Sequence, residues 1–154
     1  MIVVSDTSAV TSLIQIGRVE VLTRLYGEIF IPQAVRNELL QTHPALPAFL
    51  RVRQTGAEDE VHRLCAELDL GEAEAIILAK EIRADYLLID ETLGRQVAIR
   101  EGVKVIGLLG VLLEGKERGY LTSVREVTAE LETIAGFRVT HAVKQIIFRE
   151  AGEA

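Results

Sequence analysis

The chain lacks most of the residues that build cross-links and soft-metal sites. Cysteine occurs once in 154 residues, as Cys65, so the sequence excludes an intramolecular disulfide and a multi-cysteine metal site. The three histidines, at positions 43, 62 and 141, are scattered without the spacing of zinc ligands. Any metal bound by this chain is therefore expected to be held by carboxylates.

Long hydrophobic runs and an excess of basic residues are also missing. No apolar stretch approaches the roughly 20 residues needed to span a bilayer, and Asp6 interrupts the first one too early for a secretory signal. We therefore expect a cytoplasmic protein without membrane association. The 17 Lys and Arg residues against 23 Asp and Glu give a net charge of -6, which argues against a general affinity for nucleic acid.

Short aliphatic segments alternate with helical patterns along most of the chain. Such alternation predicts an α/β fold with a parallel sheet of four or five strands, covered by helices on both faces. Hydrophobic residues make up 49% of the sequence, with four Phe, three Tyr and no Trp, an aliphatic composition that suits this architecture. The expected strands are 2–4, 28–31, 86–89 and 103–106, with a fifth, edge strand at 51–53.

Helices are expected between and after these strands, because apolar residues repeat at intervals of three and four and glycines mark several ends. Cys65 occupies an inward position of one such pattern and is expected in the core. No repeat, low-complexity tract or second domain is legible, so we predict one domain over 1–150 with a short C-terminal tail at 151–154. The expected helical ranges are 9–16, 19–26, 32–40, 58–68, 71–80, 93–101, 108–115, 124–134 and 142–149.

Acidic residues stand at or near the carboxyl ends of the expected strands. Asp6 follows the first strand, and Asp90 repeats that position on a later one. Glu38, Glu72 and Glu74 belong to helices that flank the sheet. Since the carboxyl ends of parallel strands meet along one edge, these side chains are expected to share a pocket.

Each acid also has a purely structural explanation. Asp6 can cap the helix that follows it, and Glu38 can face solvent. Glu72 and Glu74 can favour the N-terminus of their helix through its dipole, an effect of roughly 0.3 to 1 kcal/mol. They are two positions apart and cannot point the same way on a regular helix, so one is expected to join the pocket and the other is not.

Taken together, the acids favour a hard cation. Unpaired carboxylates a few ångströms apart repel one another unless a cation bridges them, and oxygen ligands select Mg²⁺ or Mn²⁺ over softer metals. One or two such ions would activate a water and stabilise the leaving oxygen of a phosphodiester. The expected metal ligands are Asp6, Glu38, Glu72, Glu74 and Asp90.

Four segments, in this order and spacing, resemble PIN domains. The similarity covers residues 1–150 and is closest in kind to small prokaryotic PIN proteins, which share the GEAEAI-type helix and a glycine-punctuated segment such as 105–112. The four segments are Val3-Val4-Ser5-Asp6-Thr7-Ser8, the helix from Pro32 to Glu38, Gly71-Glu72-Ala73-Glu74-Ala75-Ile76, and Leu88-Ile89-Asp90-Glu91.

The resemblance implies a Rossmann-like PIN fold and cleavage of single-stranded RNA with Mg²⁺ or Mn²⁺. It also implies frequent service as the toxin of a toxin–antitoxin pair, although the sequence shows no antitoxin partner. PIN relatives commonly dimerise, so a homodimer is expected, with the apolar segments 108–113 and 146–148 as sources of surplus hydrophobic surface. The alternative for these segments is plain core packing.

Carried over by position, the resemblance assigns roles to individual residues. Glu74 falls where many relatives have Asp, so Glu72 competes for its role. Arg95, one turn after Asp90, is expected to contact a substrate phosphate. The catalytic acids would be Asp6, Glu38, Glu74 and Asp90, with Thr7, Ser8 and Thr92 supporting the carboxylates or a bound water through hydrogen bonds.

Two other enzyme classes with an early acid fit this sequence poorly. A phosphatase of the haloacid dehalogenase type needs a second Asp two residues after the first, where this chain has Ser8. A response-regulator receiver needs a Lys after its last strand, where this chain has Gly107.

The main alternative function is a catalytically weak or inactive PIN-like module that binds nucleic acid or protein. The acidic surface and the lack of legible stacking residues favour this alternative, whereas the intact set of acids favours the nuclease. Two divalent ions would change the net charge from -6 to about -2, since -6 + 4 = -2, and so lower the barrier to an RNA strand. Metal-dependent cleavage separates the two functions.

Overall fold

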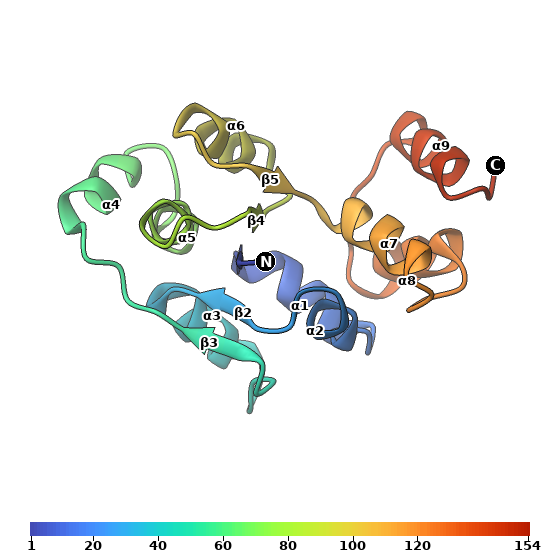
Figure 1. Cartoon of the computed structure of the whole chain (residues 1–154), viewed down its shortest axis with the longest axis horizontal. Helices are drawn as coiled ribbons and strands as arrows, with labels where there is room; N and C mark the ends of the chain where they lie inside the picture. The colour runs from blue at the N-terminus through green and yellow to red at the C-terminus, as the bar shows by residue number, and fades with distance from the viewer.

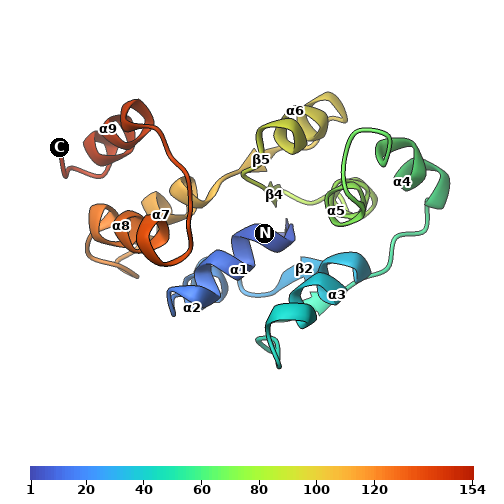
Figure 2. The same cartoon turned by 180° about the vertical axis from the view of Figure 1, so that it is seen from behind.

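A computed structural model describes the whole chain, residues 1–154, as one parallel sheet enclosed by helices (Figures 1 and 2). The strand order is β3-β2-β1-β4-β5, so the first strand lies at the centre, and every pairing is parallel. The prediction of an α/β fold with a parallel sheet is confirmed. The strands are β1 (Val3–Ser5), β2 (Ile29–Ile31), β3 (Leu50–Val52), β4 (Tyr86–Leu88) and β5 (Val105–Ile106).

Nine helices fill the spaces between and beyond the strands. Helix α3 lies beside α5, and α4 covers the far side of α5, whereas α7, α8 and α9 gather at the opposite end of the molecule (Figure 1). None of the helices is both long and apolar enough to cross a membrane. Their bounds are α1 (Thr7–Gln15), α2 (Glu20–Tyr26), α3 (Gln33–Thr42), α4 (Glu58–Leu64), α5 (Leu70–Glu81), α6 (Thr92–Arg100), α7 (Leu108–Glu117), α8 (Val124–Ile134) and α9 (His141–Glu150).

Two hydrophobic cores occupy the two faces of the sheet. Val3 packs into the core formed with α1, α2, α7 and α8, whereas Val4 packs into the core formed with α4, α5 and α6. Successive residues of a strand point to opposite faces, so a fully buried β-branched pair is what a central strand requires. The prediction that helices cover both faces is therefore confirmed, and the carboxyl edge of β1 is held rigidly from both sides.

Local boundaries differ from the sequence prediction at two informative places. Cys65 is exposed rather than buried, because α4 ends at Leu64 and the helical period that placed the thiol inward stops there. Pro32 is the cap residue of α3 rather than its first helical residue, with an extended backbone at φ -77° and ψ 170°. The prediction that Cys65 lies in the core was wrong because the helical pattern of the sequence continues past the end of α4.

The last residues, 151–154, fold back onto α7 and α8. The carboxylate of Glu153 accepts hydrogen bonds from the backbone N–H groups of Val124 (2.8 Å) and Arg125 (3.0 Å), which lie in the first turn of α8. Lys116 of α7 donates to the same carboxylate at 2.9 Å. The C-terminal tail thus satisfies donors that a helix start leaves unpaired and joins two helices.

Candidate active site

Asp6 is the most buried acid of the protein and lies directly after the central strand. Its side chain is 3% exposed and accepts a hydrogen bond of 3.2 Å from the N–H of Ala9, which makes it the cap of α1. No Lys, Arg or His forms an ion pair with it. Burial raises the pKa of Asp6 to about 8; the bond from Ala9 opposes this shift, and the charges of Asp90 and Glu72 add to it.

Asp90 lies just past the end of the neighbouring strand, one residue beyond the position opposite Asp6. Ser5 of β1 pairs with Leu88 of β4, so Asp6 and Asp90 emerge from adjacent strands at the same edge of the sheet. Both carboxylate oxygens of Asp90 accept from the N–H of Leu108, at 3.1 and 3.2 Å, at the start of α7. Burial raises the pKa of Asp90, while the Leu108 bond and the nearby Arg95 guanidinium oppose the shift.

Glu38 reaches the site through a hydroxyl of α1. The Thr7 hydroxyl donates to Oε2 of Glu38 at 2.5 Å, which fixes this α3 side chain one residue from Asp6. On its other side the carboxylate lies against Gly71 of α5. Thr7 therefore positions a carboxylate, in keeping with the supporting role predicted for it.

Glu72 and Glu74 point to different sides of α5, as their spacing predicts. Glu72 lies toward α6, and its charge contributes to the raised pKa of Asp6. Burial raises the pKa of Glu72 to about 7, and the charge of Asp69 adds to that shift. Glu74 instead faces α3, where it accepts a hydrogen bond of 3.0 Å from the N–H of Ala34. The structure therefore brings Glu72, and not Glu74, toward Asp6.

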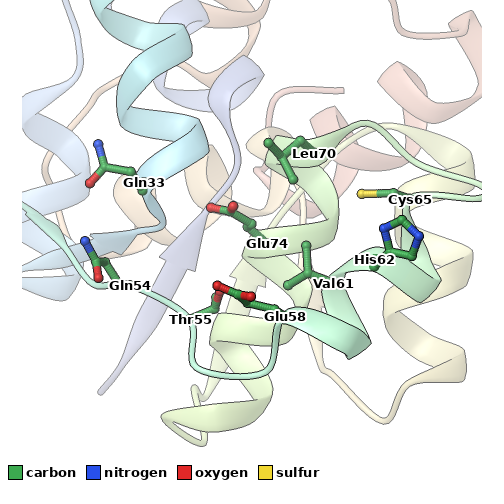
Figure 3. A pocket seen from close by; sticks show the side chains of 9 residues that line it. All are labelled: Gln33, Gln54, Thr55, Glu58, Val61, His62, Cys65, Leu70 and Glu74. Atoms are coloured by element: carbon green, nitrogen blue, oxygen red, sulfur yellow. The ribbon is translucent and has the colours of Figure 1, made fainter.

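Glu74 lines a separate cavity of about 400 Å³ between α3, α4 and α5 (Figure 3). In that close-up its carboxylate points toward Gln33 and Gln54. The two carboxylates thus lie on different sides of α5, with Glu72 toward Asp6 and Glu74 in this cavity.

Three glycines leave room for three of the acids, an arrangement that sequence reasoning missed. A Cβ atom placed on Gly107 would lie 2.7 Å from Oδ1 of Asp90, and one on Gly94 would lie 2.9 Å from Oε2 of Glu72. On Gly71 it would lie 2.5 Å from Oε1 of Glu38. The only sequence signal was that each glycine stands within a few residues of an expected strand end or helix start. Each carboxylate occupies space that any other residue would fill.

The acids of the site are the type of ligand that a hard divalent cation prefers. All the groups are carboxylates, and the buried Asp6 carboxylate has no cationic partner to balance it. In the positions described, however, no three acidic, His or Cys side chains gather closely enough to hold one ion. Asp6 and Asp90 would be the fixed ligands, and the longer Glu72 or Glu38 side chain would complete the set by rotating.

A groove of about 520 Å³ extends from Asp90 toward α9. Arg95 enters it from α6, with its Nη1 donating to the carbonyl of Ile89 at 2.9 Å. Phe137 and Arg138, in the segment between α8 and α9, line the same groove and were not singled out from the sequence. Their only signal was an aromatic beside a basic residue after Gly136. The groove places two guanidinium groups and one aromatic ring beside the Asp90 carboxylate.

Thr92 and Ser8, the other hydroxyl residues predicted to support the acids, make no hydrogen bond to a carboxylate. Thr92 is exposed and lines the groove next to Asp90. Ser8 is exposed on α1, and its hydroxyl makes no hydrogen bond within the protein. Of the three hydroxyl residues predicted to support the acids, Thr7 contacts a carboxylate and Thr92 borders the site.

Comparison with known protein families agrees with this geometry. The family model of the PIN domain matches residues 2–153, which is nearly the whole chain. No curated protein matches the sequence. The family resemblance predicted from the four acidic segments is confirmed.

Proposed function

The chain belongs to the PIN-domain family, and from this premise we propose that it is an endoribonuclease that cleaves single-stranded RNA with Mg²⁺ or Mn²⁺. Family membership supports a nuclease-type hydrolase in general, and PIN domains generally use divalent metal ions. The observation that carries the proposal is Asp6, a carboxylate 3% exposed, without an ion-pair partner, beside Asp90 on the adjacent strand. A buried anion of this kind is expensive unless it is neutralised or paired.

The chain's own groups divide the work of hydrolysis. Asp6 and Asp90 are fixed at strand ends by helix-capping hydrogen bonds, so they are preorganised to bind one or two cations. Glu38 accepts from the Thr7 hydroxyl and Glu72 lies toward α6, and rotation of either side chain would complete the carboxylate set. A divalent ion bound there supplies an activated water and neutralises charge on the leaving oxygen.

The groove beside Asp90 offers a path for the substrate. Arg95 and Arg138 present guanidinium groups that match phosphate oxygens, and Phe137 presents a half-buried ring on which a base can stack. A single strand can place a base on that ring, whereas the bases of a duplex are already stacked and paired. The groove therefore favours single-stranded RNA and offsets the overall negative charge locally.

The primary experiment is a cleavage assay with the full chain. Fluorescent single-stranded RNAs of mixed sequence are incubated with Mg²⁺, with Mn²⁺ and with EDTA, beside an Asp90→Asn variant prepared identically. We expect cleavage that requires metal and is lost in the variant. Cleavage that survives in the variant would indicate a contaminating nuclease, and binding without cleavage by folded wild type would favour the binding module.

A Gly107→Ala substitution is expected to lower cleavage about 10²-fold while leaving the fold intact. The new methyl group would displace the Asp90 carboxylate, and small displacements of reacting groups cost about that factor. The displaced atoms belong to the side chains of Asp90 and Arg95 and not to the backbone, so we expect the free energy of unfolding to change by no more than about 1 kcal/mol. Steady-state kinetics and thermal denaturation measure the two effects.

Gly56→Ala is the matched control for that variant. A Cβ atom at Gly56 meets nothing within 4 Å, so cleavage is expected to stay at the wild-type level. A Gly107→Ala protein with wild-type kinetics would show that Asp90 does not need its present position.

An Arg138→Ala substitution is expected to raise KM for RNA about fivefold with little change in kcat. Arg138 is exposed and lines the groove, so its guanidinium contributes to phosphate binding and not to the reacting atoms. The salt dependence of KM should become shallower by about one phosphate contact. Arg36→Ala, at an exposed position outside the groove, serves as the control. A fall in kcat at unchanged KM would contradict this role.

We further propose that the protein acts as the toxin of a toxin–antitoxin pair and forms a symmetric homodimer. Exposed apolar side chains at the end of α8 and along α9 supply a surface for self-association, with Ile134 60%, Ile146 54% and Val143 42% exposed. Light scattering of wild type and Ile146→Lys tests the dimer. Growth arrest on expression of wild type but not Asp90→Asn tests toxicity.

A further inference from the structure

A second cavity opens on the opposite side of α5 from Asp6. It has a volume of about 400 Å³, within the range of small-molecule sites, and it lies where β3 ends and α3, α4 and α5 begin. The lining residues that bear on its chemistry are Gln33, Gln54, Glu58, Val61, Leu70 and Glu74 (Figure 3). The cavity shares the carboxyl edge of the sheet with the site described above.

Two carboxylates of this cavity have unused hydrogen-bond acceptors, and the Thr55 hydroxyl and the His62 ring line it beside them. Glu74 uses Oε1 to accept from Ala34, which leaves Oε2 unpaired, and neither carboxylate oxygen of Glu58 takes part in a hydrogen bond or ion pair. In the view of Figure 3 the Glu74 carboxylate points toward the two glutamine side chains, whereas the Glu58 carboxylate is seen next to Thr55. A ligand that fits must therefore present several donors to the carboxylates.

The glutamines supply the complementary donors. Nε2 of Gln33 donates to Oδ1 of Asn37 at 2.9 Å, so its carbonyl oxygen is left as an acceptor. Gln54 is exposed, and its amide makes no hydrogen bond within the protein, so its NH₂ group is available to donate. Val61 and Leu70 form an apolar wall beside these groups. A flat ring with a polar edge matches this combination.

We propose that this cavity binds a guanine base of the RNA substrate. The Watson–Crick edge of guanine carries two neighbouring donors, N1–H and the 2-amino group, which fit a carboxylate in a paired arrangement. The same edge carries one acceptor, O6, which fits the Gln54 amide. Adenine, cytosine and uracil each present only one donor group on that edge, so they cannot form the paired contact with a carboxylate.

The proposal rests on the function proposed above and specifies its substrate. Glu72 and Glu74 are two residues apart on α5, about 3 Å along the helix axis, so the cavity and the acid site are separated by little more than the width of that helix. Gln33 and Glu38 connect the same two regions along α3. A guanine held in the cavity therefore lies close to the phosphate that is cleaved, so the cavity selects where the strand is cut.

Binding of single nucleotides separates this inference from the nuclease proposal, because it needs neither metal nor cleavage. The four nucleoside 5′-monophosphates, inosine 5′-monophosphate and L-arginine are titrated into the full chain in EDTA by ligand-observed NMR. We expect the guanosine compound to bind at least about tenfold more tightly than the other nucleotides, the discrimination of one well-formed paired contact. Inosine monophosphate, which lacks the 2-amino group, should bind about tenfold more weakly than the guanosine compound.

Two variants and a control locate the binding in the cavity. Glu74→Gln and Glu58→Gln replace acceptors with amides of similar shape and should each weaken guanosine monophosphate binding, Glu74→Gln by about tenfold. Asp59→Asn changes a neighbouring exposed acid that does not line the cavity and should leave binding unchanged. Thermal denaturation of each variant verifies that it is folded.

The outcomes distinguish the two proposals. Guanine-selective binding that is lost in Glu74→Gln supports the inference even in a protein that cleaves no RNA. Equal binding of all nucleotides, or none, overturns the inference even if metal-dependent cleavage is found. L-arginine binding as tightly as guanosine monophosphate also overturns it and assigns the cavity to a basic side chain of a protein partner.

Discussion

An Asp6→Asn protein is expected to lose RNA cleavage by about 10³-fold and, in EDTA at pH 8, to unfold at a higher temperature than the wild type. Loss of cleavage follows because the amide cannot supply the charge that holds a cation. The gain in stability follows because Asp6 is 3% exposed and without an ion-pair partner, so its charge destabilises the metal-free fold. Asn keeps the oxygen that accepts from Ala9, and the α1 cap is retained.

The pH dependence of stability has a definite sign. The pKa of Asp6 is about 8 in the folded state and 3.8 for the ordinary side chain, so between these values the folded protein holds a proton that the unfolded chain has released. Stability contributed by the neutral carboxyl is complete below about pH 4 and is lost as pH rises toward 8. Glu72, whose pKa is raised to about 7, acts in the same direction. The metal-free wild type should therefore become less stable between pH 5 and pH 8.5, by an amount on the order of 3 kcal/mol.

Thermal denaturation across that pH range, with and without Mg²⁺, measures the effect. The slope against pH should be smaller in Asp6→Asn but not zero, because burial also raises the pKa of Glu72 and of Asp90. Added Mg²⁺ should stabilise the wild type more at pH 8 than at pH 6, and should stabilise the variant little. Asp59→Asn, at an exposed site, is the control. An Asp6→Asn protein less stable than wild type at every pH would mean that the carboxylate is satisfied inside the fold.

A matched pair, Glu72→Gln and Glu74→Gln, is expected to give clearly unequal losses. Glu72→Gln should lower kcat about 10²-fold, because its charge acts on Asp6 and its carboxylate is one of the proposed cation ligands. Glu74→Gln should lower kcat less than about tenfold, because its carboxylate is bonded to Ala34 on the other side of α5.

The two losses should also differ in kind. Glu72→Gln should raise the concentration of Mn²⁺ needed for half-maximal cleavage, whereas Glu74→Gln should leave that concentration unchanged and reduce the preference for guanine. Kinetics at varied Mn²⁺ on RNAs with and without guanine measure both effects. A larger metal effect in Glu74→Gln would instead support the assignment of Glu74 that the family pattern implies.

The sequence predicted the central elements of the fold and site because their signals are local. Val3 and Val4 form an apolar pair that only a doubly covered strand can bury, and Asp6 and Asp90 follow directly after such strands. Their convergence required only the rule that parallel strands end at one edge. The same reasoning held for the order of helices and strands throughout the chain.

The sequence could not predict the orientation of side chains around a helix or the contacts between segments that are distant along the chain. The sequence showed that Glu72 and Glu74 diverge but could not say which one faces Asp6, since that depends on how α5 rotates against the sheet. Phe137 and Arg138 reach the site only because the segment after α8 folds back toward Asp90. The sequence indicated that Gly107 precedes a helix. Its close approach to the Asp90 carboxylate, 17 positions earlier, depends on the tertiary structure and could not be predicted.

The two strand-end acids also bring together the N-termini of two helices. Asp6 caps α1, and Asp90 accepts from the first residue of α7, so two aligned sets of peptide dipoles end at one place. Each set contributes roughly half a positive charge at its N-terminus. Carboxylates that can attract a cation therefore lie next to two positive helix N-termini, which can attract an anion. That polarity would favour the proposed binding of an RNA phosphate chain to this acidic protein.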